Sequence, residues 1–191
     1  MLLRPKKGCV GGVPICLNPL RLPFYGLGLN ESGHVVRAFR TDELQQVMHI
    51  NSVCLPENYS SFFYRDLYQK YPETFLVAEA DGDVQGYIMC RVEKGWSKLG
   101  MLTPARLCHV VSVAVLEGYR RRGIGRDLVV EAMRRGRDVY GAGEGYLEVR
   151  VSNESAIGLY SKLGFQKVKR NYGYYMDGED AWVMASGLSG F

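Results

Sequence analysis

The sequence predicts an α/β domain with a mixed central sheet of about seven strands flanked by four helices. Short β-rich runs alternate with amphipathic helical stretches through residues 34–187 of the 191-residue chain. Residues 107–151 have the pattern strand–turn–helix–strand, which joins two parallel strands by a right-handed crossover. Asp81-Gly82 lies between two other β-rich runs, as is typical of an antiparallel hairpin. Parallel and antiparallel pairs together predict a mixed sheet.

The first two elements are a strand over residues 35–39 and a helix that starts beside Thr41. Thr41 is a candidate N-cap, and the two acidic residues after it suit the positive end of the helix dipole. The apolar stripe of this helix consists of Leu44, Val47, Met48 and Val53. Leu55-Pro56 ends the helix, because proline disfavours a helical conformation in the residue before it.

The middle of the chain is expected to hold a second helix over 61–71 and two hairpin strands over 74–80 and 84–92. Residues 94–105 are expected to form a loop. Residues 107–115 are a long β-rich run, which predicts the first strand of the parallel pair.

The last third of the chain starts with a helix over 124–139, which leads to the second parallel strand over 145–151. A short helix over 155–163 is stopped by Gly164, a residue type favoured just after helix ends. The two final strands are expected over residues 166–172 and 180–185.

Residues 1–33 are rich in glycine, proline and leucine and show no sustained period. We expect them to be an extension, partly disordered or packed on the surface. The domain then covers 34–187, with a tail over 188–191. No apolar run approaches the roughly 20 residues that span a bilayer, and glycine and proline interrupt any signal-peptide core. We therefore expect a cytoplasmic protein with no membrane contact.

The five cysteines are odd in number and widely spaced. No Cys-x-x-Cys or Cys/His pair has the spacing of a zinc site. Neither a disulfide framework nor a bound metal is expected.

The net charge of +4 is concentrated in one segment. Residues 120–137 contain seven arginines and two acidic residues, which leaves 17 basic and 18 acidic residues elsewhere. Such a segment suits a polyanionic partner, so a basic nucleic-acid-binding protein is one alternative. The sequence has no recognised nucleic-acid-binding module, so no sequence-specific nucleic acid is expected.

Within this segment, a strand and a helix are joined by the turn Arg120-Arg121-Arg122-Gly123-Ile124-Gly125. Glycines let the backbone approach a ligand, and a helix N-terminus favours an anion. Arginine adds charge and forked donors, so the turn suits a pyrophosphate. It lacks the spacing of a P-loop or of the dinucleotide-binding fingerprint. The alternative is a solvated basic helix face with glycines for turning.

The stretch HVVSVAVLEGYRRRGIGRDLV, residues 109–129, resembles the acetyl-CoA signature of the GNAT acetyltransferases. The family's turn has the pattern Arg/Gln-x-x-Gly-x-Gly/Ala, which Arg120, Gly123 and Gly125 match. Residues 146–165 resemble the family's second cofactor motif. The resemblance implies a GNAT fold, in which two central parallel strands splay apart to admit acetyl-CoA.

Two further stretches resemble the catalytic subunits of protein N-terminal acetyltransferases, the archaeal enzymes above all. They are LPENY at 55–59 and YYMDGEDAWVM at 174–184. The resemblance covers roughly residues 35–187 and implies an enzyme that acetylates the α-amino group of proteins.

The resemblance also implies where acetyl-CoA, a co-substrate, binds. The implied contacts are Val113, Ala114, Val115, Arg120, Arg121, Arg122, Gly123, Ile124, Gly125, Arg126, Asn153, Ala156 and Tyr160. Asn153, Ala156 and Tyr160 share one helix face. The Tyr160 hydroxyl is implied to approach the thioester sulfur and to act as the acid. The alternative for Tyr160 is a packed core aromatic.

Glu148 shares one face of its strand with Tyr146 and Arg150 by alternation. A carboxylate in a core strand needs a partner or a function, and a salt bridge such as one to Arg150 is the alternative. For His109 the alternative is a satisfied edge histidine. The resemblance implies that His109 and Glu148 are base-type residues. Glu57 is a third candidate, implied to lie near the substrate amine, and otherwise a loop acid.

The resemblance implies two walls around a peptide N-terminus. The implied substrate contacts are Leu55, Pro56, Glu57 and Tyr59 on one side and Tyr174 and Tyr175 on the other. For the two hairpin tyrosines the alternative is an ordinary cross-strand pair.

The expected reaction is direct transfer of an acetyl group from acetyl-CoA to a protein N-terminus in a ternary complex, with a Glu/His base acting through a water. The expected partners are the N-termini of nascent or completed proteins, with a possible ribosome contact and no auxiliary subunit. The alternative within the fold is a lysine or small-amine acetyltransferase.

Overall fold

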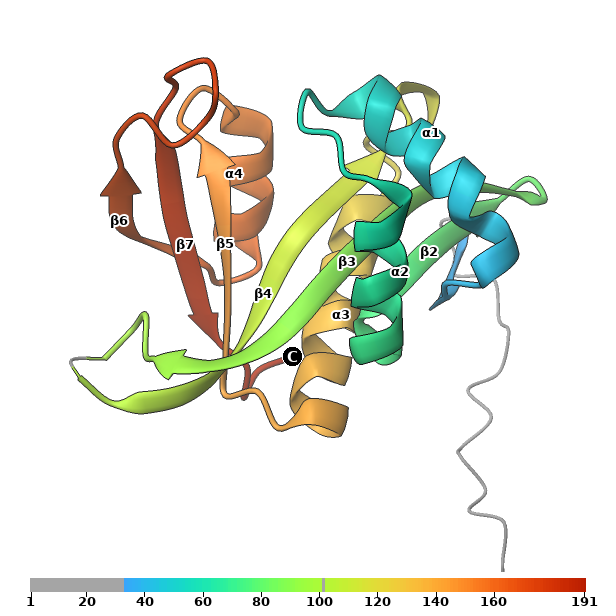
Figure 1. Cartoon of the computed structure of the whole chain (residues 1–191). Coiled ribbons are helices and arrows are strands. Elements are labelled where there is room, and N and C mark those ends of the chain that lie inside the picture. The colour runs from blue at the N-terminus through green and yellow to red at the C-terminus, as the bar shows by residue number, and fades with distance from the viewer. Residues whose placement is uncertain (1–32, 101) are drawn as a thin grey trace, which may run out of the picture.

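The computed structural model of the chain describes residues 33–100 and 102–191 (Figure 1). The expected N-terminal extension, apart from Gly33, lies outside the described residues. The strands within them are β1 (Val35–Ala38), β2 (Phe75–Ala80), β3 (Asp83–Trp96), β4 (Pro104–Val115), β5 (Glu144–Arg150), β6 (Gln166–Asn171) and β7 (Ala181–Gly187). The α-helices within them are α1 (Leu44–Cys54), α2 (Ser61–Lys70), α3 (Ile124–Tyr140) and α4 (Glu154–Lys162).

The seven strands of the described residues form one sheet in the order β1-β2-β3-β4-β5-β7-β6. β4 and β5 are parallel, and every other neighbouring pair is antiparallel. The predicted mixed sheet of seven strands with four α-helices is therefore confirmed.

Each face of the sheet is covered by a pair of helices (Figure 1). On one face, Val47 and Ile50 of α1 pack with Phe75 of β2 in one buried cluster. On the other face, Leu128 of α3 packs with Leu147 of β5 in a second cluster, to which α4 also contributes. Burying each large apolar side chain contributes about 1.5–3 kcal/mol, so the two clusters hold the sheet between its helices.

β4 and β5 pair over a short length and then separate. Their register consists of Leu107↔Glu144, Cys108↔Gly145 and His109↔Tyr146. Beyond His109, β4 stays paired with β3 through Val115, while β5 stays paired with β7 through Arg150. Figure 1 shows the two strands diverging from this point. The splay implied by the family resemblance is present in the fold.

A β-bulge lies just past the last β4–β5 pair. Cys90 pairs with Val110 and Met89 with Ser112, which leaves Val111 as the extra residue on β4. A bulge bends its strand and increases the local twist. Its position fits a strand that turns away from β5 directly after His109.

Two expectations about the first helix are wrong. Thr41 is not an N-cap, because Thr41–Glu43 form a 3-10 turn ahead of α1. The Arg40 N–H instead donates to Glu43 Oε2 at 2.8 Å. Val53 is 62% exposed. It lies six residues after Val47, about 240° around the helix and away from the buried face.

The expected loop over 94–105 is shorter than predicted, because strands cover both of its ends. β3 continues to Trp96 and β4 begins at Pro104, with Gly95 opposite Ala105. This part of the hairpin projects from the sheet as a two-stranded ribbon (Figure 1). Most of its described side chains are exposed, so the segment lacks the apolar alternation of a half-buried strand.

The end of α4 confirms the role predicted for Gly164. Its φ is 88°, its N–H donates to Ser161 C=O, and the Phe165 N–H donates to Tyr160 C=O. These two bonds form a Schellman motif, which satisfies carbonyls at the helix end. Among the described residues, no helix combines the length and the apolar composition needed to cross a membrane. Nor do three or more His, Cys, Asp or Glu side chains gather there as a metal site would require.

Candidate active site

The loop between β4 and α3 has the backbone of an anion-binding turn. Gly123 has φ 85° and Arg121 has φ 64°, so the chain turns sharply before α3. The first helical bond runs from the Asp127 N–H to Gly123 C=O. The amides of residues 124–126 therefore precede the intrahelical ladder and lie at the positive end of the helix dipole. These predicted cofactor residues form one contiguous site.

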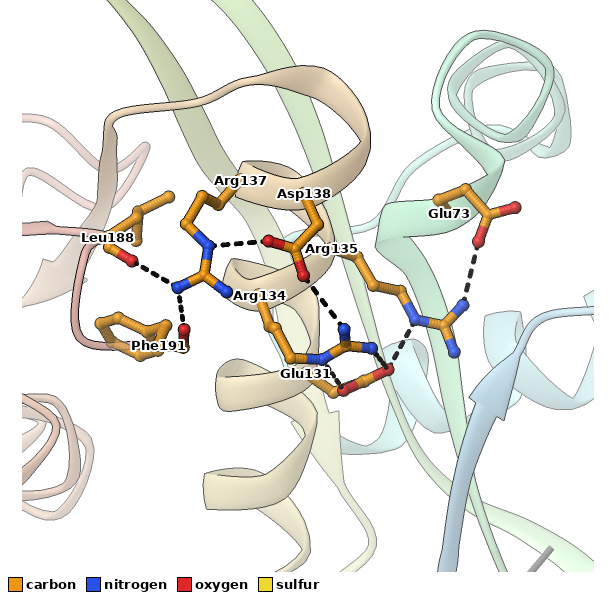
Figure 2. Close-up of polar contacts among 8 residues, drawn as sticks. All are labelled: Glu73, Glu131, Arg134, Arg135, Arg137, Asp138, Leu188 and Phe191. Atoms are coloured by element: carbon orange, nitrogen blue, oxygen red, sulfur yellow. Dashed lines mark hydrogen bonds and ion pairs between the residues drawn. The ribbon is translucent and has the colours of Figure 1, made fainter. Parts of the chain in front are cut away.

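The arginine-rich segment divides into two parts. In the second part, Arg134, Arg135 and Arg137 make ion pairs with nearby acids (Figure 2). Arg137 also donates to the carbonyls of Leu188 and Phe191, which fixes the end of the chain against α3 (Figure 2). The second part is thus largely neutralised within the protein, in the manner of a structural helix.

The first part of the segment, Arg120 to Arg126, surrounds the turn and is exposed at its arginines. Arg120 Nε donates to Val115 C=O at 2.9 Å, so this side chain ties the turn to the end of β4. Arg122 lies over the Tyr119 ring at 4.7 Å, and Arg126 pairs with Asp127 at 3.0 Å.

The backbone at 113–115 borders the splay, as expected for a pantetheine site. Val113, Ala114 and Val115 pair with β3 on one side only, opposite Ile88, Tyr87 and Gly86. β5 no longer pairs with them on the other side. Val115 C=O accepts from Arg120 Nε, and the rest of this edge of β4 is open to a ligand that supplies hydrogen bonds.

His109 and Glu148 meet at the base of the splay. His109 Nε2 lies 2.7 Å from Glu148 Oε2, and the two side chains are 11% and 16% exposed. His109 Nδ1 is buried and has no hydrogen-bond partner among residues 33–100 and 102–191. The partner of Glu148 is thus His109. The alternative salt bridge from Glu148 to Arg150 is not formed, because Arg150 pairs with other carboxylates.

Arg150 instead connects the two expected walls of the peptide site. Its guanidinium lies 2.6 Å from Glu57 Oε1, 2.7 Å from Asp177 Oδ2 and 2.8 Å from Glu179 Oε2. It also lies over the Tyr175 ring, 3.9 Å from the centroid. One side chain of β5 therefore joins the α1–α2 loop to the β6–β7 loop.

Two of the carboxylates around Arg150, Asp177 and Glu179, are held in the ionised form. Hydrogen bonds from Ser152 and Arg150 lower the pKa of Glu179. Bonds from the Glu179 N–H and Arg150 lower the pKa of Asp177. Glu57 shares the same cation, so it behaves as part of an ion-pair cluster.

The predicted substrate residues border the same region. The Tyr59 hydroxyl donates to Val111 C=O at 3.4 Å, which sets the α1–α2 loop, including Leu55 and exposed Pro56, against β4. The Tyr174 and Tyr175 rings make an edge contact at 5.1 Å, and Tyr174 is 48% exposed. Burial, followed by Glu57, raises the pKa of Tyr175, so its hydroxyl keeps its proton near neutral pH.

Tyr160 lies on the opposite face of β5 from Glu148. It is 6% exposed and packs in the same cluster as Leu147 and Val149. Burial, with a smaller contribution from Cys90, raises the pKa of Tyr160, so the phenol stays protonated. It does not touch the His109–Glu148 pair.

The other two residues predicted on the Tyr160 helix face lie at the start of α4. Asn153 is its N-cap, and Asn153 Oδ1 accepts the Ala156 N–H at 3.1 Å. The Asn153 oxygen therefore serves the helix, which leaves its amide N–H groups to face outward.

The sequence interpretation missed two features of the site. From the sequence, Arg150 is expected only as an alternative partner of Glu148, and Tyr146 only as a neighbour on the same strand face. Tyr146 stacks on the His109 ring, with centroids 4.3 Å apart. The alternation that places Tyr146, Glu148 and Arg150 on one face was the available signal. Their partners come from loops whose positions local sequence does not specify.

Comparisons with known proteins agree with this geometry. The profile of the acetyltransferase (GNAT) family matches residues 44–165. The chain is 51% identical over 154 residues to an N-alpha-acetyltransferase of Sulfurisphaera tokodaii, an alignment that covers 80% of this chain and 92% of the relative.

Two solved structures extend the comparison. One is Ard1 from Thermoplasma volcanium, with TM-score 0.70 and 28% identity over 81% of this chain and 97% of that one. The other is Arabidopsis thaliana Naa50 in complex with the bisubstrate analogue CoA-Ac-MVNAL, with TM-score 0.69 and 28% identity over 81% and 98% of the two chains.

Proposed function

Because the chain belongs to the acetyltransferase (GNAT) family, we propose that it transfers the acetyl group of acetyl-CoA to the α-amino group of protein N-termini. The observation that carries the proposal is the His109–Glu148 pair at the base of the splay, framed by two loops that Arg150 joins. The N-alpha-acetyltransferase activity named for the relative from Sulfurisphaera tokodaii supports the same substrate.

Acetyl-CoA fits the features of the cofactor side. Its phosphates suit the amides and arginines of the turn over 120–126, and its pantetheine suits the open edge of β4 at 113–115. The Naa50 structure similar to this chain contains a CoA-based bisubstrate analogue. When bound, acetyl-CoA supplies the activated acetyl thioester.

The acceptor amine must be neutral to attack. An α-amino group has a pKa of about 7.7–8.0, against about 10.4 for lysine, so its deprotonation is easier by about 3.4 kcal/mol. A modest base is therefore sufficient at neutral pH. This preference favours an N-terminus over a lysine side chain.

His109 and Glu148 are the groups we assign to accept that proton, through a bridging water. His109 Nε2 hydrogen-bonds to one carboxylate oxygen of Glu148, and His109 Nδ1 is buried. The second carboxylate oxygen of Glu148 is therefore the atom we assign to take the proton from the water. Glu57 is the weaker candidate, since Arg150 binds its carboxylate. We assign Glu57 to the wall of the peptide site instead.

Tyr160 is assigned to the thiol side. It keeps its proton, as its raised pKa requires, and it lies across β5 from Glu148. The proton acceptor and the proton donor therefore lie on opposite faces of the strand, which keeps them from neutralising each other.

All groups that this proposal needs belong to one chain, so we propose that the protein acts without an auxiliary subunit. We place the reaction in the cytoplasm, on the N-termini of nascent or completed proteins. A contact with the ribosome through exposed basic residues is part of the same proposal.

A matched set of acceptors tests the function. Purified protein with acetyl-CoA should acetylate a peptide with a free N-terminus and no lysine. It should act poorly on the same peptide when the N-terminus is blocked and a lysine is added, or on a small polyamine. Faster reaction with lysine or polyamine would transfer the assignment to the lysine or small-amine class.

A thermal-shift comparison tests the alternative of a nucleic-acid-binding protein. Acetyl-CoA at 100 times its Kd should stabilise the fold by about 2.7 kcal/mol. Stabilisation by RNA or DNA without stabilisation by acetyl-CoA would favour that alternative.

A further inference from the structure

His109 and Tyr146 form the last cross-strand pair before β4 and β5 separate. Their rings stack with centroids 4.3 Å apart and an interplanar angle of 5°. Glu148 is the next residue on the same face of β5 and bonds to His109 Nε2. The imidazole is therefore in contact with both residues of β5 that share this face at the base of the splay.

Tyr146 is itself held firmly. Its hydroxyl donates to Glu93 Oε1 at 2.6 Å, and Glu93 Oε2 lies 3.0 Å from Arg91 Nε on the same strand. The residue is 5% exposed. Burial, followed by Glu93, raises the pKa of Tyr146, so the hydroxyl stays a donor. The ring therefore has a fixed position before any substrate binds.

His109 lacks the second fixing contact that a histidine ring usually has. A hydrogen bond at one nitrogen commonly sets the tautomer and orientation of the ring for the other nitrogen. Here Nδ1 is buried without a partner among the described residues. Apart from the bond to Glu148, the His109 ring has the parallel stack on Tyr146, and this contact defines the plane of the imidazole.

We propose that Tyr146 is a positioning residue, whose ring fixes the plane of the His109 imidazole so that Nε2 stays directed at Glu148. The inference deepens the proposed function and rests on it, since His109 is assigned there to the proton acceptor.

Several charged and titratable groups face this pair from each neighbouring element. They are Glu148 on β5, Arg91 and Glu93 on β3, Lys98 in the β3–β4 loop, and Tyr59 and Tyr174 in the two loops. Lys98 Nζ lies over the Tyr146 ring, 4.6 Å from its centroid. A variant that removes only the Tyr146 ring leaves all of these charges in place.

The first test compares Tyr146→Leu, Tyr146→Phe and a control, Tyr140→Leu, which removes a half-buried tyrosine ring at the far end of α3. We expect Tyr146→Leu to lower kcat roughly tenfold with little change in the KM of acetyl-CoA. Tyr146→Phe keeps the stack and should lose about threefold or less. Equal losses in the two Tyr146 variants, or a rise in KM alone, would overturn the proposal. If Tyr146→Leu does not fold, Tyr146→Met takes its place.

The second test separates positioning from a general structural effect. In a His109→Gln background, Tyr146→Leu should change kcat less than about twofold, because the ring that it positions is gone. The same tenfold loss in both backgrounds would contradict the proposal. NMR titration of the three histidines, with His109 assigned from the His109→Gln spectrum, should show a shifted midpoint for His109 in Tyr146→Leu.

The NMR titration of His109 does not depend on enzymatic activity, so it tests the positioning role separately from the proposed function. If the wild-type protein fails to acetylate N-terminal peptides, the proposed function is wrong. An unchanged His109 titration and line shape in Tyr146→Leu would show that the stack does not orient the ring, whatever the reaction is.

Discussion

The two ends of the splay are built in different ways. The cofactor end uses backbone: a turn with two left-handed residues, helix amides and the open edge of β4, all within residues 113–126. The acceptor end uses side chains: His109 with Glu148, and Arg150 with Glu57, Asp177 and Glu179. The first end is contiguous in sequence, and the second is assembled from four separate segments.

This difference predicts where substitutions matter. Backbone amides persist through most side-chain changes, so the cofactor end should respond chiefly to changes that alter its conformation. At the acceptor end each interaction belongs to a particular side chain and is lost with it. Substitutions there should lower turnover or peptide binding and leave acetyl-CoA binding intact.

The largest effect is expected for Glu148→Gln. The amide cannot accept a proton as a carboxylate does, so kcat should fall by about 100-fold or more. The KM of acetyl-CoA should remain within about twofold of the wild-type value. Steady-state kinetics with a saturating N-terminal peptide measures both, and a kcat close to wild type would remove Glu148 from the proton path.

Arg150→Ala should have the next largest effect. The change leaves Glu57 without its cation and separates the α1–α2 loop from the β6–β7 loop. We expect kcat/KM for the peptide to fall about 10- to 30-fold, which corresponds to the lower part of the roughly 1.5–3 kcal/mol that a charged hydrogen bond contributes. Arg150→Lys keeps the charge and loses the forked geometry, so it should recover only part of the activity. Full activity in Arg150→Ala would mean that the two walls need no link.

Gly123→Ala should produce a smaller effect, confined to the cofactor end. Gly123 has φ 85°, and a Cβ in that conformation costs about 1–2 kcal/mol. The KM of acetyl-CoA should rise several-fold while kcat changes little. Gly125→Ala is the matched comparison, because Gly125 lies within α3. The added Cβ would lie 3.5 Å from Leu159 Cδ2 of α4, which is an ordinary van der Waals contact. Gly125→Ala should raise the KM of acetyl-CoA less than Gly123→Ala does. A larger rise in Gly125→Ala would contradict the view that backbone conformation determines cofactor binding at this turn.

The smallest effect is expected on stability in acid. Asp177 and Glu179 have pKa values lowered from 3.8 and 4.5 by their hydrogen bonds, Arg150 among the donors. A carboxylate whose pKa is lower in the folded state than in the unfolded state stabilises the fold at pH values above its unfolded-state pKa. That contribution is lost as the pH falls through its folded-state pKa. The free energy of unfolding should therefore decline below about pH 4.5. Denaturation at pH 7, 5, 4 and 3 should show a shallower decline in Arg150→Ala.

The sequence predicted the fold and the turn before α3 well, because both depend on local patterns. Alternation and turns predicted seven strands, and the Arg120–Gly125 turn predicted the loop before α3. It was wrong at both ends of the loop expected over 94–105, where mostly exposed side chains remove the apolar alternation of a half-buried strand. Val53 was predicted on the apolar stripe of the first helix because it is apolar. The helical period places it on the exposed side instead.

The acceptor end was less predictable for a physical reason. His109 and Glu148 were named together through the family resemblance, but their direct bond depends on where β4 and β5 separate. The ion-pair cluster at Arg150 needs the α1–α2 and β6–β7 loops to meet across the sheet. Interactions between residues 93 positions apart, such as Glu57 and Arg150, leave no periodic signal in a single sequence.

The division between the two ends is tested most directly by acetyl-CoA binding to a His109→Gln/Glu148→Gln double variant, measured by isothermal titration calorimetry. We expect a Kd within about twofold of wild type, while acetyl transfer to an N-terminal peptide falls by about 100-fold or more. A Kd that weakens in proportion to the lost rate would contradict the division. The pair would then belong to cofactor binding, and the proton acceptor would lie elsewhere.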